Sequence, residues 1–404
     1  MNSSSASSQP LTAVLSEITL TSQPTLSGEV KPSALSRTGG MLTAMLLGLC
    51  GISAASAQTQ YTVTELAVLP GQVSCVAEQL NNLGDVVGYC APADEFFNQI
   101  GVVWRNGTVS SVGKLSKGNY SVATAINSQG TIAGDGDKGD FSPRSWVTQE
   151  DGSLLNFFRN NGGNTHALFM GDNGFIGGYY TGSTSGGWLG AIWTPNPKKP
   201  DRYNTRDLPI LPGGIDPASS NTIPSAFNQS GQAAGSGSND QIGQHAVFWN
   251  NDAANSIVDL GVYPGDWSSV ANGMNDLGQV VGSSHPPFGS RPILWNNNAA
   301  QTPIELPVLA GDNYGSATTI NNSGVILGRS YYGTPGTWDA TPSRQVVWED
   351  GVVFELQSSL DPVTGAGLTL TYASAINNAG QIAATATRAD GVKRAILLTP
   401  MALP

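Results

Sequence analysis

The ten-residue stretch GMNDLGQVVG (Gly273–Gly282) decides the fold of this 404-residue chain, because copies of it recur throughout the sequence. The clearest copies are AINSQGTIAG (Ala125–Gly134) and TINNSGVILG (Thr319–Gly328). Weaker copies are QLNNLGDVVG (Gln79–Gly88), FMGDNGFIGG (Phe169–Gly178), AFNQSGQAAG (Ala226–Gly235) and AINNAGQIAA (Ala375–Ala384). The seven units are centred on Gly84, Gly130, Gly174, Gly231, Gly278, Gly324 and Gly380. A period of about 45 to 55 residues indicates a solenoid, a propeller or an array.

The Asn-x-x-Gly phrase predicts a tight hairpin turn, because Asn and Gly tolerate the backbone twist of such turns. A strand precedes each turn, and the strand after it carries adjacent apolar residues such as Val280 and Val281. Adjacent strand residues point to opposite faces. We therefore expect both faces of each sheet to be buried, as in sheets that stand side by side.

A third strand in each unit ends in Trp, and a short turn then leads to a fourth strand such as IVDLG (Ile257–Gly261). Leu398 takes the Trp place in the seventh unit; the other units carry Trp104, Trp146, Trp193, Trp249, Trp295 and Trp348. We expect these Trp side chains to be wedges between sheets. Four short strands per unit predict an all-β, seven-bladed β-propeller over residues 58–404.

The two ends of the chain predict how the ring closes. The seventh unit ends at Pro404 without a fourth strand, whereas YTVTELAVLPG (Tyr61–Gly71) reads as a fourth strand with its exit loop. We expect this N-terminal strand to complete the last blade and to remove a free sheet edge. The alternative, an open solenoid, needs distinct capping units, and the sequence shows none.

Composition and the first residues bound the class of protein. With 50 Gly, 12% charged residues and a net charge of −11, the chain fits neither a coiled coil nor a nucleic-acid partner. Residues 1–57 combine a Ser/Thr-rich start, the apolar run Met41–Ser53 and the small-residue triplet Ala55-Ser56-Ala57. This pattern predicts a signal peptide with a long n-region, hence a secreted, extracellular or periplasmic protein. The alternative is a membrane anchor, for which the run is short.

Cleavage would leave two cysteines, Cys75 and Cys90. If Asn82 and Leu83 form the tip of the first hairpin, paired residue numbers sum to 165, which places the two cysteines directly opposite each other. A disulfide is the expectation for an even number of cysteines in a secreted protein. The alternative is a pair of buried free thiols.

The unit SSVANGMNDLGQVVG (Ser268–Gly282) and the strand HAVFW (His245–Trp249) resemble the HAF-type extracellular repeat family. The resemblance covers about Tyr61 to Leu398. The His that names the family occurs only at His245, and the other units carry Ile100, Ser142, Leu189, Arg291, Arg344 and Arg394 in its place. The resemblance implies secretion and a repeat fold, and it implies no catalytic residues.

Loops between second and third strands, and between blades, share one face of such a ring, and these are the long loops of the sequence. We expect a ligand site on this long-loop face, because binding residues gather on loops carried by a rigid scaffold. The candidate ligand-binding residues are Trp188, Trp267, Trp338, Tyr314, Tyr332, Asp266 and Asp312. The aromatic ones could stack on a sugar; the alternative is that they pack the loops.

The loop GDGDKGD (Gly134–Asp140) places Asp135, Asp137 and Asp140 at a spacing that could wrap a calcium ion, and the alternative is a solvated turn. No other cofactor is indicated. His166 reads as a lone core histidine, and enzyme motifs are absent. The sequence therefore favours a secreted, monomeric, non-catalytic module that binds carbohydrate or protein. The alternative is a secreted glycan hydrolase or lyase with Asp94, Asp266 or Asp312 at the channel mouth.

Overall fold

The computed structural model describes residues 58–92, 98–157, 164–181, 188–212, 221–238, 243–296, 302–337 and 340–402. The predicted signal peptide, Phe96, Asp94 and Trp338 lie outside these residues. No helix in the described part of the chain is long and apolar enough to cross a membrane.

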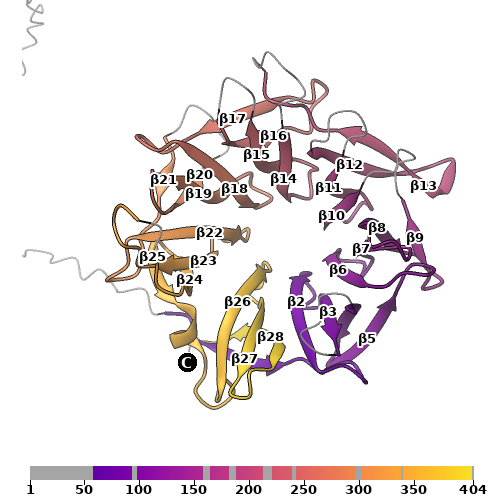
Figure 1. Cartoon of the computed structure of the whole chain (residues 1–404), viewed down its shortest axis with the longest axis horizontal. Helices are drawn as coiled ribbons and strands as arrows, with labels where there is room; N and C mark the ends of the chain where they lie inside the picture. Colours follow the sequence, from indigo (N-terminus) through magenta and orange to yellow (C-terminus); the bar gives the residue numbers. More distant parts are fainter. Residues whose placement is uncertain are drawn as a thin grey trace, which may run out of the picture. The chain divides into compact units, whose positions relative to one another are not determined.

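Seven four-stranded antiparallel sheets stand as blades in a ring, so the predicted propeller is confirmed (Figure 1). Blade 1 holds β2 (Ser74–Leu80), β3 (Val86–Ala91), β4 (Ile100–Arg105) and β5 (Thr108–Gly113); blade 2 holds β6 (Ser121–Ile126), β7 (Ile132–Gly136), β8 (Arg144–Thr148) and β9 (Leu154–Asn156). Blade 3 holds β10 (Thr165–Met170), β11 (Ile176–Thr181), β12 (Trp188–Asn196) and β13 (Lys199–Asp207).

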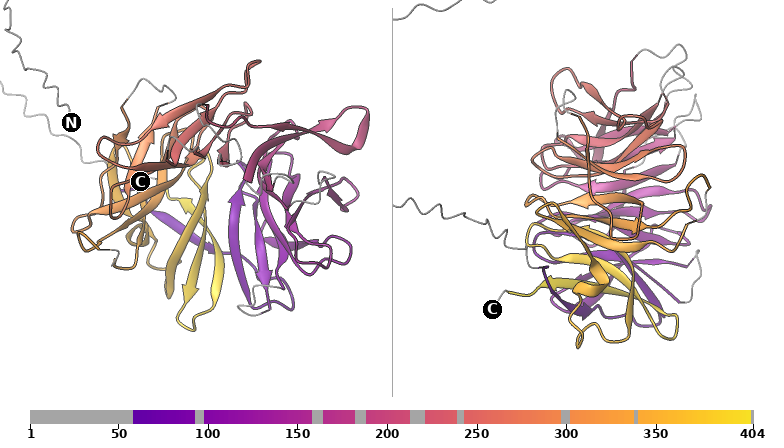
Figure 2. Two further views of the ribbon diagram at one scale, coloured as in Figure 1. Left: turned by 45° about the horizontal axis from the view of Figure 1, so that its top comes forward. Right: turned by 90° about the vertical axis from the view of Figure 1, so that its left-hand side faces the viewer.

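The remaining blades repeat this order from the central channel outward (Figure 1), and Figure 2 shows the ring from two further sides. Blade 4 holds β14 (Asn221–Phe227), β15 (Ala233–Ser238), β16 (His245–Trp249) and β17 (Ile257–Gly261); blade 5 holds β18 (Ser268–Met274), β19 (Val280–His285), β20 (Arg291–Trp295) and β21 (Ile304–Glu305). Blade 6 holds β22 (Tyr314–Ile320), β23 (Ile326–Tyr331), β24 (Arg344–Glu349) and β25 (Val352–Glu355); blade 7 holds β26 (Leu368–Ile376), β27 (Ile382–Arg388), β28 (Lys393–Pro400) and β1 (Tyr61–Glu65).

The N-terminal strand closes the ring as expected. β1 pairs with β28, with Tyr61 opposite Pro400 and Glu65 opposite Ile396. The outer edge of β1 is also covered, because Asp361 N–H donates to the Tyr61 carbonyl (2.8 Å) and Val63 N–H donates to Thr364 Oγ1 (3.0 Å). The last blade therefore presents less free edge than a bare strand would.

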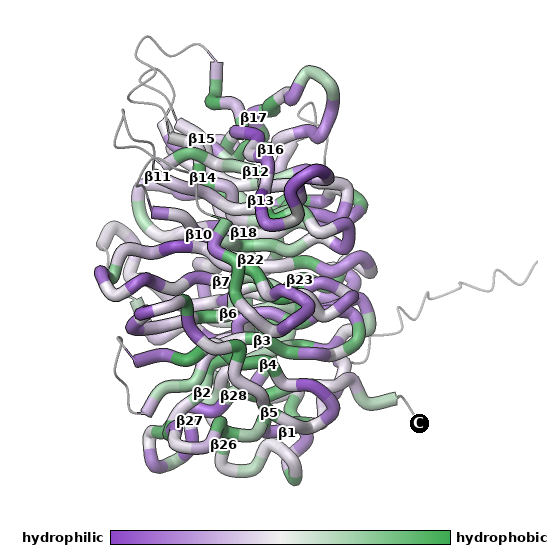
Figure 3. Tube along the Cα trace, turned by 90° about the vertical axis from the view of Figure 1, so that its right-hand side faces the viewer, coloured by the Kyte–Doolittle hydropathy of each residue, from purple (hydrophilic) through white to green (hydrophobic). Residues whose placement is uncertain are grey.

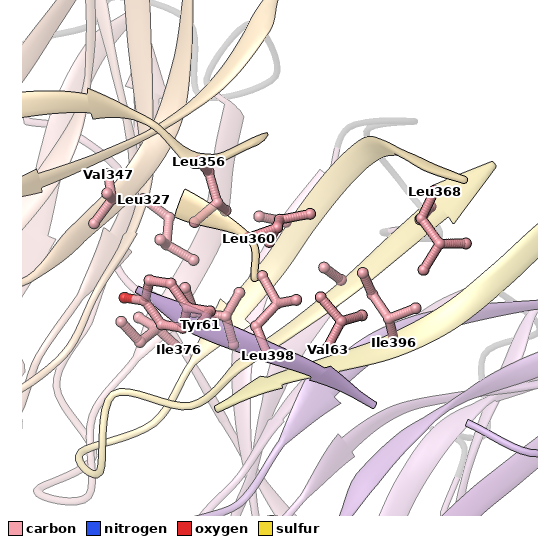
Figure 4. Packing of buried hydrophobic residues seen from close by; sticks show 14 residues of the cluster. Tyr61, Val63, Leu327, Val347, Leu356, Leu360, Leu368, Ile376, Ile396 and Leu398 are labelled. Atoms are coloured by element: carbon pink, nitrogen blue, oxygen red, sulfur yellow. The ribbon is translucent and has the colours of Figure 1, made fainter. Parts of the chain in front are cut away.

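Each blade interface is filled by its own hydrophobic cluster, and hydrophobic segments run through the strands (Figure 3). Val280 packs with blade 4 and the adjacent Val281 packs with blade 6, which confirms burial on both faces. The six repeat Trp side chains are buried wedges that contact the preceding blade. In the last blade, Leu398 and Tyr61 fill the place of the missing Trp (Figure 4).

The Cys75–Cys90 disulfide is confirmed, with an S–S distance of 2.03 Å, although the register that predicted it was wrong near the turn. The hairpin loop has three residues, because Asn81 N–H donates to Asp85 O, so Leu80 pairs with Val86. A β-bulge at Glu78 then shifts the pairing by one residue and brings the cysteines opposite each other. The two departures from a plain hairpin cancel.

That bulge recurs in the inner strand of every blade. It directly follows the residue that stands four positions before the turn Asn, or before Gly171 in unit 3, which we call the small residue of the unit. The small residues are Ala77, Ala123, Ala167, Pro224, Ala271, Ala317 and Ala373. The bulged residues are Glu78, Thr124, Leu168, Ser225, Asn272, Thr318 and Ser374. The last Gly of the repeat stands opposite the small residue in six blades. A Cβ at Gly282 would lie 2.0 Å from the Val270 carbonyl oxygen, so this position excludes any other residue without a backbone shift.

The repeat Asn holds its turn as expected. In blade 5, Asn275 Oδ1 accepts the N–H groups of Leu277 (3.1 Å) and Gln279 (3.0 Å). The Gly that follows has a φ between +72° and +83° in all seven units, a conformation that favours glycine.

The same Asn also links its blade to the next one, which sequence reasoning missed. Asn275 Nδ2 donates to the Asn321 carbonyl oxygen of blade 6 (3.0 Å), and Asn377 Nδ2 donates to Asn81 O across the closure (3.1 Å). Six of the seven interfaces carry this bond, which we call the first ring. It is broken between blades 3 and 4, where Gly171 replaces Asn.

A second ring lies one residue further along each turn. The N–H of Asp276 donates to Asn322 Oδ1 of the next blade (2.9 Å), and six interfaces carry the equivalent bond. The interface between blades 1 and 2 lacks it. Asp172 N–H donates to Gln229 Oε1 (2.9 Å) where the first ring is broken. Each interface therefore keeps at least one side-chain bond between turns.

We expect Asn275→Ala to lower the free energy of unfolding by about 2 kcal/mol, because buried turn and inter-blade hydrogen bonds are both lost. Asn275→Asp keeps the Oδ1 acceptor and removes the Nδ2 donor, which bonds both Asn321 O of blade 6 and Gln279 Oε1 of its own hairpin. It should still cost at least about 1 kcal/mol, measured by urea unfolding. The control Asn250→Ala removes a side-chain bond within blade 4 (Asn250 Nδ2 to Ser256 Oγ). A wild-type midpoint for Asn275→Asp would contradict the inter-blade role.

Candidate functional site

The aromatic candidates of the long-loop face differ in exposure. Trp267, just before β18, is 71% exposed, and Tyr332, just after β23, is 43% exposed. Tyr314 is partly buried, because it packs against Tyr331 with ring centroids 5.8 Å apart. Tyr314 therefore serves loop packing, whereas Trp267 and Tyr332 leave their rings accessible.

The structure places Trp188 in a compact aromatic cluster with His166 and Tyr179. The ring of Trp188 lies 5.1 Å from that of Tyr179, edge to face, and 5.6 Å from that of His166. His166 and Tyr179 rings are 4.9 Å apart. The three residues come from β12, β10 and β11, at the ends of these strands toward the long-loop face. Strands rather than loops thus hold the rings.

Asp135 of β7 ties this cluster to blade 2. Its Oδ2 lies 2.8 Å from His166 Nδ1, and its Oδ1 accepts from Ala167 N–H (3.0 Å) and Ser145 Oγ (2.9 Å). A carboxylate can only accept, so His166 carries a proton on Nδ1. In the neutral ring, Nε2 is then an acceptor. Asp135, His166, Tyr179 and Trp188 together form what we call the channel-mouth cluster.

This arrangement corrects the interpretation of His166 as a lone core histidine. Its side chain is partly exposed and is paired with a carboxylate. The sequence signal was present: Asp135 follows the last Gly of unit 2, and His166 precedes the small residue of unit 3. These two positions face each other across a blade interface, which only the register reveals.

The three carboxylates proposed for calcium each have separate partners. Asp137 accepts the backbone N–H groups of Asn119, Gly139 and Phe141. Burial raises the pKa of its carboxyl, but the hydrogen bonds from Phe141 and Asn119 outweigh burial and lower the pKa. Asp140 forms an ion pair with Arg144 at 2.6 Å. In the part of the chain that the structure describes, no three His, Cys, Asp or Glu side chains are placed to hold a metal ion.

Asp266 and Asp312 both pair with an arginine of the long-loop face. Asp266 lies 3.3 Å from Arg291 Nε, and Asp312 lies 2.8 Å from Arg344 Nη2. Their side chains are almost fully buried, at 2% and 7% exposure. These ion pairs hold in place the loops that carry Asp266 and Asp312.

The position of the family His is structural in four blades. His245 Nδ1 lies 2.9 Å from Asp259 Oδ2 on the neighbouring outer strand. Arginine takes this place in the next three blades and pairs with the outer-strand acid, in Arg291–Glu305, Arg344–Glu355 and Arg394–Glu65. A His or Arg on the third strand thus contacts an acid on the fourth strand in each of these blades.

The end of the channel opposite the long-loop face contains a cavity. A cavity of about 240 Å³ is lined by the ends of all seven inner strands and by their turns. Many of its polar side chains, such as Asn81, Gln229 and Asp276, already belong to the two rings. Many polar groups at this end of the channel therefore serve structural hydrogen bonds between blades.

Glu78, the bulged residue of blade 1, has no hydrogen bond or ion pair among the described residues. Burial raises its pKa to about 7. Tyr372 of β26 is nearby: desolvation raises the pKa of its phenol, the Glu78 carboxylate raises it further, and Arg329 lowers it. Glu78 of blade 1 and Arg329 of blade 6 therefore both act electrostatically on Tyr372 of blade 7, which lies between them.

Glu78→Gln should make stability less dependent on pH. The ordinary pKa of Glu is 4.5, so between about pH 4.5 and 7 the native protein holds a proton that the unfolded chain has lost. The free energy of unfolding of the wild type should therefore fall as pH rises through this window. The difference in free energy of unfolding between Glu78→Gln and wild type should shift by about 1–2 kcal/mol in favour of the variant from pH 5 to pH 8, measured by urea unfolding. This figure is smaller than the full pKa shift would give, because solvent screens a partly exposed carboxyl group.

The exposed turn residue Glu150 offers the control, as Glu150→Gln. Equal pH slopes for both variants would show that Glu78 titrates like a solvent-exposed carboxylate.

Comparison with solved structures places this geometry among propellers. The chain is similar to a structure from a study of two prolyl endopeptidases (TM-score 0.50, 9% identity), covering 83% of this chain and 51% of that one. It is also similar to the β-propeller domain of the Trilobed protease from Pyrococcus furiosus (TM-score 0.49, 10% identity, 80% and 95% covered). A gluconolactonase from Xanthomonas campestris matches with a TM-score of 0.35 and 12% identity over 85% and 96% of the chains.

These likenesses show the fold alone, and the chain spans about half the length of the endopeptidase. No family model matches the sequence, and no relative is found among curated proteins.

Proposed function

We propose that this protein is a secreted, non-catalytic binding module that takes a carbohydrate at the channel-mouth cluster. The observation that carries the proposal is the group of three aromatic side chains, His166, Tyr179 and Trp188, whose ring centroids lie within 6 Å of one another. Asp135 fixes the imidazole of His166 among them. Aromatic faces stack on the C–H faces of sugar rings, and the free His166 Nε2 can accept a sugar hydroxyl. The disulfide supports an oxidising, extracytoplasmic location.

The ion pairs of the two acidic candidates that the structure describes favour binding over hydrolysis. Asp266 and Asp312 are engaged with arginines, and a glycosidase needs two carboxyl groups that can change protonation state beside the sugar. We also propose that the chain belongs to the HAF-type repeats. The His245–Asp259 pair supports this proposal, because it gives the His that names the family a structural partner on the fourth strand.

Trp188→Ala should weaken binding of a neutral oligosaccharide hit from a glycan array by about tenfold or more, because it removes one stacking surface of about 1.5 kcal/mol. Titration calorimetry gives the affinity. Trp267→Ala is the matched control: it removes a more exposed Trp of the same face that lies outside the cluster. Equal losses in both variants, or a loss only with Trp267→Ala, would move the site away from the cluster.

A further inference from the structure

The pairing of Asp135 with His166 belongs to a position that every blade interface repeats. The first position of each pair directly follows the last Gly of a unit (Ala384 in unit 7), as Asp135 follows Gly134. The second position directly precedes the small residue of the next unit, as His166 precedes Ala167. The two positions face each other across the blade interface. Asp135 meets His166 in this way, and Thr385 Oγ1 likewise accepts the N–H of Ala77, next to Val76. The pairs are Tyr89 and Val122, Asp135 and His166, Tyr179 and Ile223, Ser236 and Val270, Ser283 and Ser316, Arg329 and Tyr372, and Thr385 and Val76.

Two of these seven pairs contain a charged residue, and they lie at blade interfaces on opposite sides of the ring. Asp135–His166 is at the interface of blades 2 and 3, and Arg329–Tyr372 is at that of blades 6 and 7. These interfaces are four steps apart in a ring of seven (Figure 1). A ligand that stacks on the channel-mouth cluster and extends over the channel would approach Arg329.

The guanidinium of Arg329 is uncommitted, in contrast to most arginines of the described chain. Six others are paired with carboxylates: Arg105, Arg144, Arg291, Arg344, Arg388 and Arg394. Arg206 is bonded to the side-chain amides of Asn251 and Asn255. Arg329 and Arg202 are exposed and have no hydrogen bond or ion pair among the described residues, and Arg202 lies on the outer strand β13.

From this placement we infer that the ligand is an acidic oligosaccharide that crosses the channel, so that its carboxylate binds Arg329 while another sugar ring of the same molecule stacks on Trp188. The inference rests on the proposed function and specifies its ligand class. A planar guanidinium binds a carboxylate through two parallel hydrogen bonds, which a neutral sugar cannot offer. The phenol of Tyr372, on the innermost strand beside Arg329, supplies a further donor to the same carboxylate.

Glu78, on the innermost strand of blade 1, does not neutralise this arginine. It is the carboxyl group that acts electrostatically on Tyr372 together with Arg329, and no ion pair joins it to Arg329. Its raised pKa means that it carries little charge in mildly acidic solution. A carboxylate of ordinary acidity on a sugar remains ionised there and therefore meets Arg329 without an internal competitor.

The test uses the full mature protein and two matched probe pairs: a galacturonate tetramer and a glucuronate-containing tetrasaccharide, each with its methyl ester. Calorimetry at pH 6 and low salt should show at least one acid bound ten times or more tighter than its ester. Arg329→Gln should reduce that ratio to near one while the ester still binds. Arg202→Gln, the other uncommitted arginine, should leave the ratio unchanged.

The outcomes separate the two proposals. If the esters bind as well as the acids, or if Arg202→Gln lowers the ratio as much as Arg329→Gln, the inference is overturned and the carbohydrate site stands. If Trp188→Ala leaves binding of acids and esters intact, the proposed site itself is wrong. A higher affinity of Glu78→Gln for the acid at pH 8 would support the inference, and a lower one would count against it.

Discussion

The structure depends on the hydrogen bonds that join one turn to the next around the channel. A blade alone buries neither of its faces, so its stability comes from its neighbours. The two rings add a directional constraint to that hydrophobic contact. Asn275, for example, satisfies its own turn through Oδ1 and fixes the next blade through Nδ2. One side chain thus determines both local conformation and the angle at which the next sheet packs.

The breaks in the rings show how this constraint is distributed. Gly171 removes the Asn donor from blade 3, and there the second ring supplies the bond from Asp172 to Gln229. Between blades 1 and 2 the second ring is missing, and Asn81 supplies the bond to Asn127. The closure between blades 7 and 1 carries both kinds of bond, in addition to the pairing of β1 with β28. The junction made of chain ends is thus as well connected as an internal one.

Much of the scaffold could be predicted because short-range pattern specifies it. The turn residues, the buried Trp wedges, the opposite facing of Val280 and Val281 and the closing strand all follow from spacing along the chain. The bulge at Glu78 could not be predicted, since no residue type demands it, and without it the cysteine register came out right for the wrong reason. The second bond of each Asn was missed because it joins residues about 45 positions apart.

The candidate site was harder to predict for the same reason. Trp188 was named for its loop position, but its partners His166, Tyr179 and Asp135 come from three other strands in two blades. Asp266 and Asp312 looked available in sequence, and their arginines lie 25 and 32 residues away. We propose that function resides in residues, such as Arg329, that lack an ion pair among the described residues, and pairing is visible only in three dimensions.

Native-state hydrogen exchange tests most directly the claim that the rings make the blades one unit. Inner-strand amides of all seven blades would be followed by mass spectrometry in increasing, sub-denaturing urea. The account predicts that they converge on a single opening free energy, equal to that of global unfolding. Blades that open one by one, with free energies graded from the interface of blades 3 and 4 outward, would show that hydrophobic contact alone joins neighbouring blades.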